Sequence, residues 1–225
     1  MKLYIDSADL KQIAYIQEYY PISGVTTNPS IIVKENRPYL ALLKDIREVI
    51  GEEKELFVQV VGEKAVEMIE EAKFISRQLS GAVVVKVPVT EEGVKAIKQL
   101  SAENIPTLAT TIYTSFQALM AAMAGAKYVA PYVNRIDNLT GSGVKVVAEI
   151  AALFAAYRLP TQIIAASFKN VQQVHDVCLS GAESVTVGPD IIKKLIAFPA
   201  TTLDVEAFKK EWQNMYGVKN SLVNS

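Results

Sequence analysis

Short apolar runs alternate with longer amphipathic segments along almost the whole chain. Short runs that are rich in β-branched residues and bounded by turn-forming residues are typical of strands buried on both faces. We therefore predict eight strands, at Lys2–Asp6, Gly24–Asn28, Leu56–Val61, Ala82–Pro88, Thr107–Tyr113, Tyr128–Val133, Gln162–Phe168 and Ser184–Val187.

The segments between these runs have the pattern of amphipathic helices. In Lys64–Leu79, apolar residues recur at helical spacing and charged residues occupy the other positions. Glu91–Glu103 follows Thr90, a good N-cap, and begins with acidic residues that suit the helix dipole. The other predicted helices are Ser7–Tyr20, Pro38–Ile50, Ser115–Ala124, Val144–Tyr157, Val171–Leu179 and Pro189–Ala197.

Eight strands alternating with eight helices in 225 residues favour an α/β fold, a (β/α)8 TIM barrel that forms a single domain over residues 1–225. A doubly wound open sheet is the alternative, because alternation by itself does not show closure. The first strand is not followed by a glycine-rich dinucleotide fingerprint, which weakens that alternative. A further amphipathic segment, Asp204–Tyr216, predicts an additional C-terminal helix that packs on the barrel or on a neighbouring subunit.

Composition narrows the class of protein. A net charge of −1 gives no reason to expect nucleic acid or a membrane as partner. The single cysteine, Cys178, cannot form an intrachain disulfide and fits a reducing cytosol. The single histidine, His175, leaves no zinc-type ligand cluster. With no signal peptide and no apolar run long enough to span a bilayer, we expect a soluble, cytoplasmic protein.

Lys86 interrupts the apolar run Ala82–Pro88. A lysine in such a strand lies at an edge with its charge in water, pairs with a carboxylate, or points into a catalytic cavity. Because desolvation disfavours the charged form, a buried amine can lose its proton near neutral pH and attack a carbonyl carbon.

Polar residues stand at or just beyond the C-terminal ends of seven predicted strands: Asp6, Asn28, Gln59, Lys86, Thr110, Tyr132 and Ser167. Active sites of (β/α)8 barrels lie at this end. The alternation of side chains along a strand supports an inward direction for several of them. Convergence of so many polar groups predicts an active site, although buried amides and hydroxyls such as those of Asn28, Gln59 and Thr110 also close loops.

The set has a chemical logic. Lys86 can add to a ketone and form an iminium ion, an electron sink that lets the adjacent carbon–carbon bond break or form. Asp6 is suited to bind the cation and a hydroxyl, and the Tyr132 phenol can relay a proton. Gln59 cannot titrate, so it can only orient a water or a hydroxyl, together with Thr110. Arg135, Ser167 and Lys169 are candidates for phosphate binding, although Arg135 could instead pair with Asp137.

Five stretches carry a resemblance to a known family: Leu3–Asp6, Gly24–Ser30, Val84–Pro88, Ala130–Asp137 and Ala165–Lys169. On these stretches the chain resembles the small-subunit transaldolase family, and within it the fructose-6-phosphate aldolases. The Thr26-Thr27-Asn28-Pro29-Ser30 motif together with the lysine of the fourth strand is the most specific pair.

The resemblance implies a class I, Schiff-base aldolase without metal or organic cofactor. It implies that Lys86 is the nucleophile, that Asp6 transfers protons and binds a hydroxyl, and that Asn28, Thr26 and Thr110 hold the bound ketose. The resemblance also implies that Arg135, Ser167 and Lys169 bind the phosphate. The expected partners are sugars and sugar phosphates, and a homo-oligomer, pentamer or decamer, in which the C-terminal helix reaches a neighbour.

Two positions separate members of this family. The transaldolases it resembles have a glutamate at the position of Gln59 and a phenylalanine at that of Tyr132, so this chain has the pair associated with the aldolase. We expect reversible cleavage of fructose 6-phosphate to dihydroxyacetone and glyceraldehyde 3-phosphate. A transaldolase that transfers dihydroxyacetone is one alternative, and a non-catalytic sugar-phosphate-binding barrel is another. Thr111 departs from the smaller residue of the family and could alter the preference for the acceptor.

Overall fold

A computed structural model describes residues 1–139 and 141–217. The chain divides into two compact units, Met1–Ile192 and Lys193–Ser225. Each unit is described by itself below. A single domain that comprises both stays a prediction.

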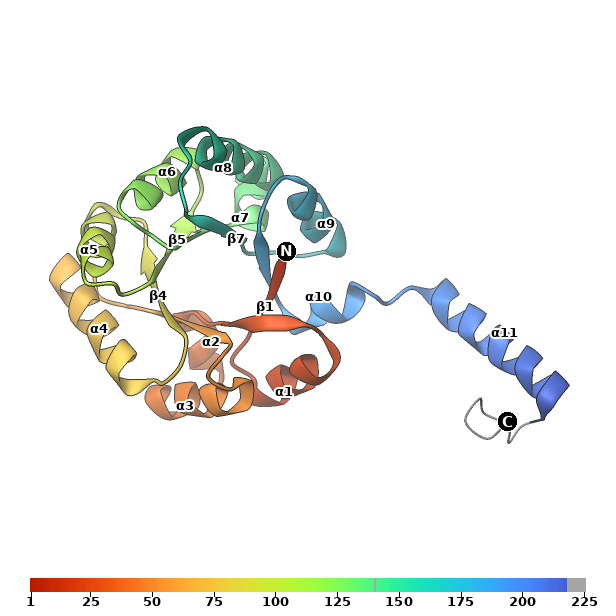
Figure 1. Ribbon diagram of the computed structural model, residues 1–225. Helices are drawn as coiled ribbons and strands as arrows, with labels where there is room; N and C mark the ends of the chain where they lie inside the picture. Colours follow the sequence, from red (N-terminus) through yellow and green to blue (C-terminus); the bar gives the residue numbers. More distant parts are fainter. Residues whose placement is uncertain (140, 218–225) are drawn as a thin grey trace. The chain divides into compact units, whose positions relative to one another are not determined.

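The first unit contains a closed barrel of parallel strands (Figure 1). The strands follow one another around the barrel in chain order. The first strand, β1 (Lys2–Asp6), closes the barrel by pairing with the last, β8 (Ser184–Val187), from Lys2↔Ser184 to Ile5↔Val187. This closure confirms the (β/α)8 TIM barrel and shows that the open-sheet alternative is wrong. The strands are β1 (Lys2–Asp6), β2 (Ile22–Thr26), β3 (Glu55–Gln59), β4 (Val83–Pro88), β5 (Thr107–Ile112), β6 (Tyr128–Pro131), β7 (Gln162–Ala165) and β8 (Ser184–Val187).

Helices surround the barrel, and each predicted helix is present with small differences at its ends. They are α1 (Leu10–Tyr19), α3 (Tyr39–Ile50), α4 (Ala65–Gln78), α5 (Glu91–Ala102), α6 (Ser115–Met123), α8 (Gly143–Tyr157), α9 (Val171–Leu179) and α10 (Pro189–Lys194). Among the helices that the structure describes, none is long and apolar enough to cross a lipid bilayer.

Two short helices were not predicted, α2 (Pro29–Lys34) and α7 (Val133–Asp137). They explain why the second and sixth strands end before Asn28 and Val133. Asn28 is the N-cap of α2 and Pro29 its first residue, a combination that favours a helix start. The seventh strand also ends early, because Ser167 has a left-handed backbone with φ 65°.

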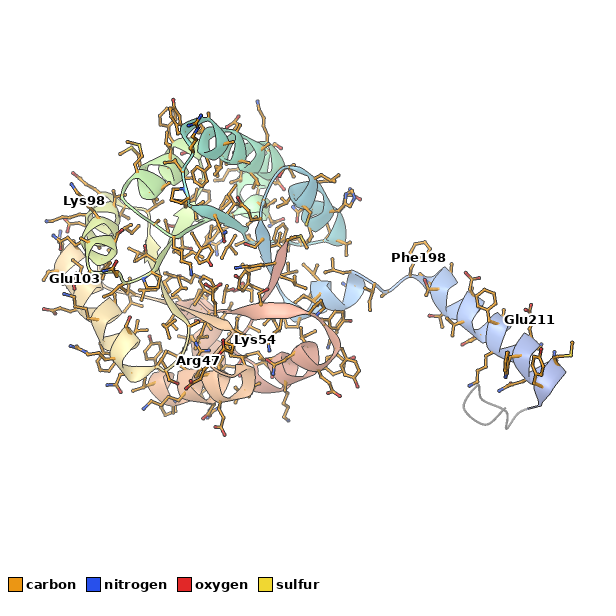
Figure 2. All side chains as sticks on the ribbon, in the orientation of Figure 1. Arg47, Lys54, Lys98, Glu103, Phe198 and Glu211 are labelled. Carbon is orange, nitrogen blue, oxygen red and sulfur yellow. The ribbon has the colours of Figure 1, made fainter. Side chains whose placement is uncertain are left out.

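Side chains fill the space that the strands enclose (Figure 2). Inside the barrel, on the N-terminal side of the predicted site residues, the rings of Tyr4 and Tyr128 pack edge-on against Phe57, with centroids 5.2 and 5.5 Å away. Their hydroxyls donate to the carboxylate of Glu55, from Tyr4 at 2.6 Å and from Tyr128 at 2.8 Å. Burial alone would raise the pKa of Glu55, but these hydrogen bonds and Lys127 lower it, so the carboxylate stays ionised.

Arg47 ties together the loops that precede two of the strands. Its guanidinium donates hydrogen bonds of 2.7 Å to the carbonyls of Gly51, Lys54 and Ala82. Figure 2 shows Arg47 and Lys54 at the α3 side of the barrel. These bonds satisfy carbonyls that precede β3 and β4 and so fix where both strands begin.

The second unit contains α11 (Pro199–Tyr216). It starts earlier than the predicted Asp204–Tyr216, because Pro199 is suited to the first position of a helix. Within it, Trp212 and Tyr216 stack with ring centroids 4.5 Å apart. The predicted C-terminal helix is therefore present.

Candidate active site

The predicted site residues extend the rows of side chains that face the inside of the barrel. Tyr4, Phe57, Val84, Leu108 and Tyr128 belong to the core inside the barrel. Because side chains alternate along a strand, the residues two positions later on the first four of these strands also face inward. These residues are Asp6, Gln59, Lys86 and Thr110, and Tyr132 packs against the same core just beyond β6.

Lys86 is buried, with 6% of its surface exposed. Its Nζ donates a hydrogen bond of 2.6 Å to the carbonyl of Thr27. In the described part of the chain, no carboxylate lies within ion-pairing distance of it. Lys86 is thus neither a strand-edge lysine in water nor half of a structural ion pair.

The environment of Lys86 shifts its protonation. Burial lowers the pKa of Lys86, and the negative charge of Asp6 partly opposes this. Burial raises the pKa of Asp6, while Lys86 and the hydroxyl of Thr26 oppose that shift. The proton affinities of the amine and the carboxylate therefore approach each other, which favours exchange of a proton between the two groups.

Asp6 is held in place by two threonines. Thr26 Oγ1 donates to Asp6 Oδ1 at 2.7 Å and also shares a hydrogen bond with Thr186 Oγ1. The Thr26 hydroxyl is therefore engaged with the protein, and its predicted contact with the ketose stays a prediction.

Thr110 and Tyr132 form a second pair. Thr110 Oγ1 lies 2.8 Å from the Tyr132 hydroxyl. Burial raises the pKa of Tyr132, although the bond from Thr110 and the charge of Arg135 oppose the shift. A protonated phenol at neutral pH can donate a proton or a hydrogen bond. The ring itself is fixed edge-on by Tyr113, with centroids 5.9 Å apart.

A bulge lies next to this pair. The register of β5 against β6 passes from Ala109↔Val129 to Ile112↔Pro131, which leaves an extra residue on β5. Thr111 within it has a left-handed backbone with φ 60°, unusual for a β-branched residue, and its hydroxyl bonds the Thr110 carbonyl at 2.6 Å. Thr111, which we expect to differ from the family pattern, is therefore also a strained residue.

The predicted phosphate-binding residues lie on two connected segments. Arg135 is on α7, with its guanidinium 4.8 Å from the centre of the Tyr132 ring. The N–H of Asn134 donates to the Ser167 carbonyl at 2.8 Å, which joins α7 to the loop that continues to Lys169. Both Arg135 and Lys169 are exposed and so accessible to a ligand from solvent. The structure thus brings all three candidates to one side of the site.

The alternative pairing of Arg135 with Asp137 does not form in the described part of the chain. Asp137 Oδ1 accepts from the backbone of Gly143 at 2.7 Å, and Oδ2 accepts from Gln173 Nε2 at 2.8 Å. The guanidinium of Arg135 is therefore available to a ligand.

Asn28 follows β2, and Gln59 is the last residue of β3, the strand that pairs with the strand of Lys86. The side-chain oxygen of Asn28 accepts from the Ile31 N–H at 3.0 Å, so capping uses the oxygen and leaves the amide NH2 for a ligand. Gln59 is adjacent to Lys86 in the register of β3 against β4, and it lines a cavity of about 190 Å³ together with Thr27 and Asn28.

Three groups that support the candidate site were not predicted from the sequence. Thr186 supports Thr26, and the available signal was that the two polar residues of β8, Ser184 and Thr186, alternate with valines and so share one face. The Thr27 carbonyl that binds Lys86 had no signal, because every residue has such a carbonyl. Gln173 bonds both Lys169 and Asp137, but in the sequence it has the pattern of an ordinary helix residue.

Residues 1–139 and 141–217 contain no group of three or more His, Cys, Asp or Glu side chains placed to hold a metal ion. The chain was also compared with known protein families. The family described as Transaldolase/Fructose-6-phosphate aldolase matches residues 3–222, nearly the whole sequence. Members of this family are enzymes. The chain belongs to the transaldolase/fructose-6-phosphate aldolase family.

Proposed function

We propose that the protein is a class I aldolase that reversibly cleaves fructose 6-phosphate into dihydroxyacetone and glyceraldehyde 3-phosphate through a Schiff base on Lys86. The observation that carries this proposal is the buried amine of Lys86, whose pKa is lowered by burial and which lies beside Asp6, whose pKa is raised. Simple sugar binding has no use for a desolvated amine, whereas imine formation requires one.

The reaction would begin when Lys86 Nζ attacks the C2 carbonyl, and loss of water from the carbinolamine yields an iminium ion. Asp6 takes the proton of the C4 hydroxyl, the C3–C4 bond breaks, and its electron pair passes into the iminium to form an enamine. Glyceraldehyde 3-phosphate then leaves. Protonation of the enamine at C3 restores the iminium, and its hydrolysis releases dihydroxyacetone and the free amine.

The preference for an aldolase over a transaldolase rests on Gln59 and Tyr132. Tyr132 is a protonated phenol paired with Thr110, suited to move protons during carbinolamine formation and breakdown. Gln59, next to Lys86 in register, can orient a water but cannot titrate. Hydrolysis of the three-carbon imine then competes well with transfer. Transaldolase activity is the second candidate, because the family match covers both reactions.

A product assay on fructose 6-phosphate separates these activities. We expect release of free dihydroxyacetone with no acceptor present, and little stimulation by erythrose 4-phosphate. Transfer that depends entirely on the acceptor would instead identify a transaldolase. A protein that releases neither product and gains no mass on borohydride reduction with dihydroxyacetone would be a binding barrel, contrary to the proposal.

Arg135→Ala should weaken phosphorylated aldehydes selectively. Loss of a charge-assisted, forked contact is expected to lower kcat/KM for glyceraldehyde 3-phosphate by about 30-fold or more, and that for glyceraldehyde much less. Steady-state kinetics with dihydroxyacetone as donor measure both values. Arg135→Lys keeps the charge but not the fork, so it should fall between wild type and Arg135→Ala. Equal losses for both aldehydes would show that Arg135 is structural.

The proposal includes assembly into a homo-oligomer in a reducing, cytoplasmic compartment. Phe116, Met120 and Met123 form an exposed apolar stripe on α6, and clustered exposed apolar side chains commonly mark protein interfaces. Taken alone, α11 has apolar residues that a single helix cannot bury. Cys178 is a free thiol, consistent with a reducing compartment.

A further inference from the structure

Gln173, in the first turn of α9, uses both ends of its side-chain amide. Its Oε1 accepts from the backbone N–H of Lys169 at 2.8 Å. Its Nε2 donates to Asp137 Oδ2 at 2.8 Å and to Asn134 Oδ1 at 3.4 Å. Lys169 belongs to the loop after β7, and the other two residues belong to α7. One amide therefore bridges the two segments that carry the phosphate-binding candidates.

We propose that Gln173 is a positioning residue that holds Arg135 against the loop containing Ser167 and Lys169, and so sets the preference for phosphorylated aldehydes. This inference rests on the proposed function of the same site. Gln173 touches no reacting atom. Its effect passes through the placement of the guanidinium of Arg135.

The shortness of α7 makes such support necessary. A helix of five residues is unstable by itself, so its orientation depends on bonds to its surroundings. Its first residues are fixed by backbone bonds to the end of β7, from Val133 to Ala166 at 2.9 Å and from Asn134 to Ser167 at 2.8 Å. Gln173 fixes its last residue, Asp137, and Arg135 stands between the two attachments.

The chemistry of the two partners explains why an amide occupies this position. The N–H of Lys169 requires an acceptor, and the carboxylate of Asp137 requires a donor. A glutamine satisfies both. A glutamate would place two carboxylates side by side, and an alanine would leave both partners without this bond. Asp137 also accepts from Gly143, the first residue of α8, so the same carboxylate ties α7 to that helix.

The expected result is a selective change in KM. Gln173→Ala should raise KM for glyceraldehyde 3-phosphate about tenfold, while KM for glyceraldehyde and kcat change by less than about twofold. The matched control is Gln172→Ala, because among the described residues the Gln172 amide bonds only its own helix, through Asp176 Oδ1 at 2.7 Å. Gln172→Ala should behave as wild type with both aldehydes.

A double variant that restores the donor–acceptor pairing distinguishes a positioning role of the Gln173 amide from an effect of side-chain size. Gln173→Glu, nearly identical in shape, should raise KM for glyceraldehyde 3-phosphate as Gln173→Ala does. Adding Asp137→Asn should restore KM to within about threefold of wild type, because the asparagine amide donates to the new carboxylate while its oxygen still accepts from Gly143. Thermal unfolding shows whether each variant is folded.

The outcomes show separately whether the proposed phosphate site or only the role of Gln173 is wrong. If wild type shows no preference for the phosphorylated aldehyde, the proposed phosphate site is wrong before Gln173 is considered. If Arg135→Ala loses the preference while Gln173→Ala retains it, the role of Gln173 alone is overturned. Equal losses with both aldehydes, or failure of Asp137→Asn to rescue Gln173→Glu, overturn it as well.

Discussion

Lys86→Met is expected to reduce turnover of fructose 6-phosphate by roughly 10⁴-fold or more, because the strand holds no other nucleophile that could form the imine. The variant should remain folded, since methionine has a similar length and suits a site that is 6% exposed. Turnover is measured by release of glyceraldehyde 3-phosphate. Borohydride reduction with dihydroxyacetone should add mass to the wild-type peptide containing Lys86 and to no peptide of the variant.

Stability measurements give Lys86→Met an independent control. The pKa of Lys86 is lowered from 10.5 on folding, so in the alkaline range below 10.5 the unfolded chain binds more protons than the folded one. The wild-type free energy of unfolding should therefore gain from Lys86 as the pH rises through that range. Lys86→Met lacks this gain. Residual activity beyond a trace, or an unchanged pH dependence of stability, would count against the proposed role of Lys86.

Tyr132→Phe is expected to lower cleavage of fructose 6-phosphate by about a hundredfold, the usual scale for removal of an acid–base group. The change deletes one hydroxyl and leaves the buried hydroxyl of Thr110 without this hydrogen bond, so the free energy of unfolding should fall by only about 1–2 kcal/mol. The rate of cleavage and a thermal unfolding curve measure the two effects.

Tyr128→Phe is the matched control, because it removes a hydroxyl from β6 at the opposite end of the barrel. Its hydroxyl bonds Glu55 at 2.8 Å rather than any group of the site. Tyr128→Phe should lower the free energy of unfolding by about 1–2 kcal/mol and leave cleavage nearly unchanged. If both tyrosine variants lose activity alike, the loss reflects the barrel and not a proton relay at Tyr132.

The fold, and the inward position of the residues at the centre of the candidate site, could be predicted from the sequence for physical reasons. Strands buried on both faces must be apolar, so Lys86 and Asp6 stood out by contrast with their neighbours, and alternation gave their direction. The short helix α7 was not readable, because it depends on bonds to distant segments rather than on its own pattern. The same is true of Gln173, whose partners lie more than thirty positions away except for Lys169.

The packed layer of Tyr4, Phe57, Tyr128 and Glu55 fills the barrel on the N-terminal side of Lys86, so substrates of the proposed reaction would enter from the opposite end. A lumen sealed by interlocked rings and a carboxylate has a single opening. Every molecule that reaches Lys86 must then leave by the path through which it came. In the proposed reaction, the aldehyde product would therefore have to depart before an acceptor approaches the enamine, so any transfer would follow an ordered, ping-pong exchange. The enamine can then either add to an incoming aldehyde or be protonated and hydrolysed. The relative rates of these two reactions would decide between transfer and release.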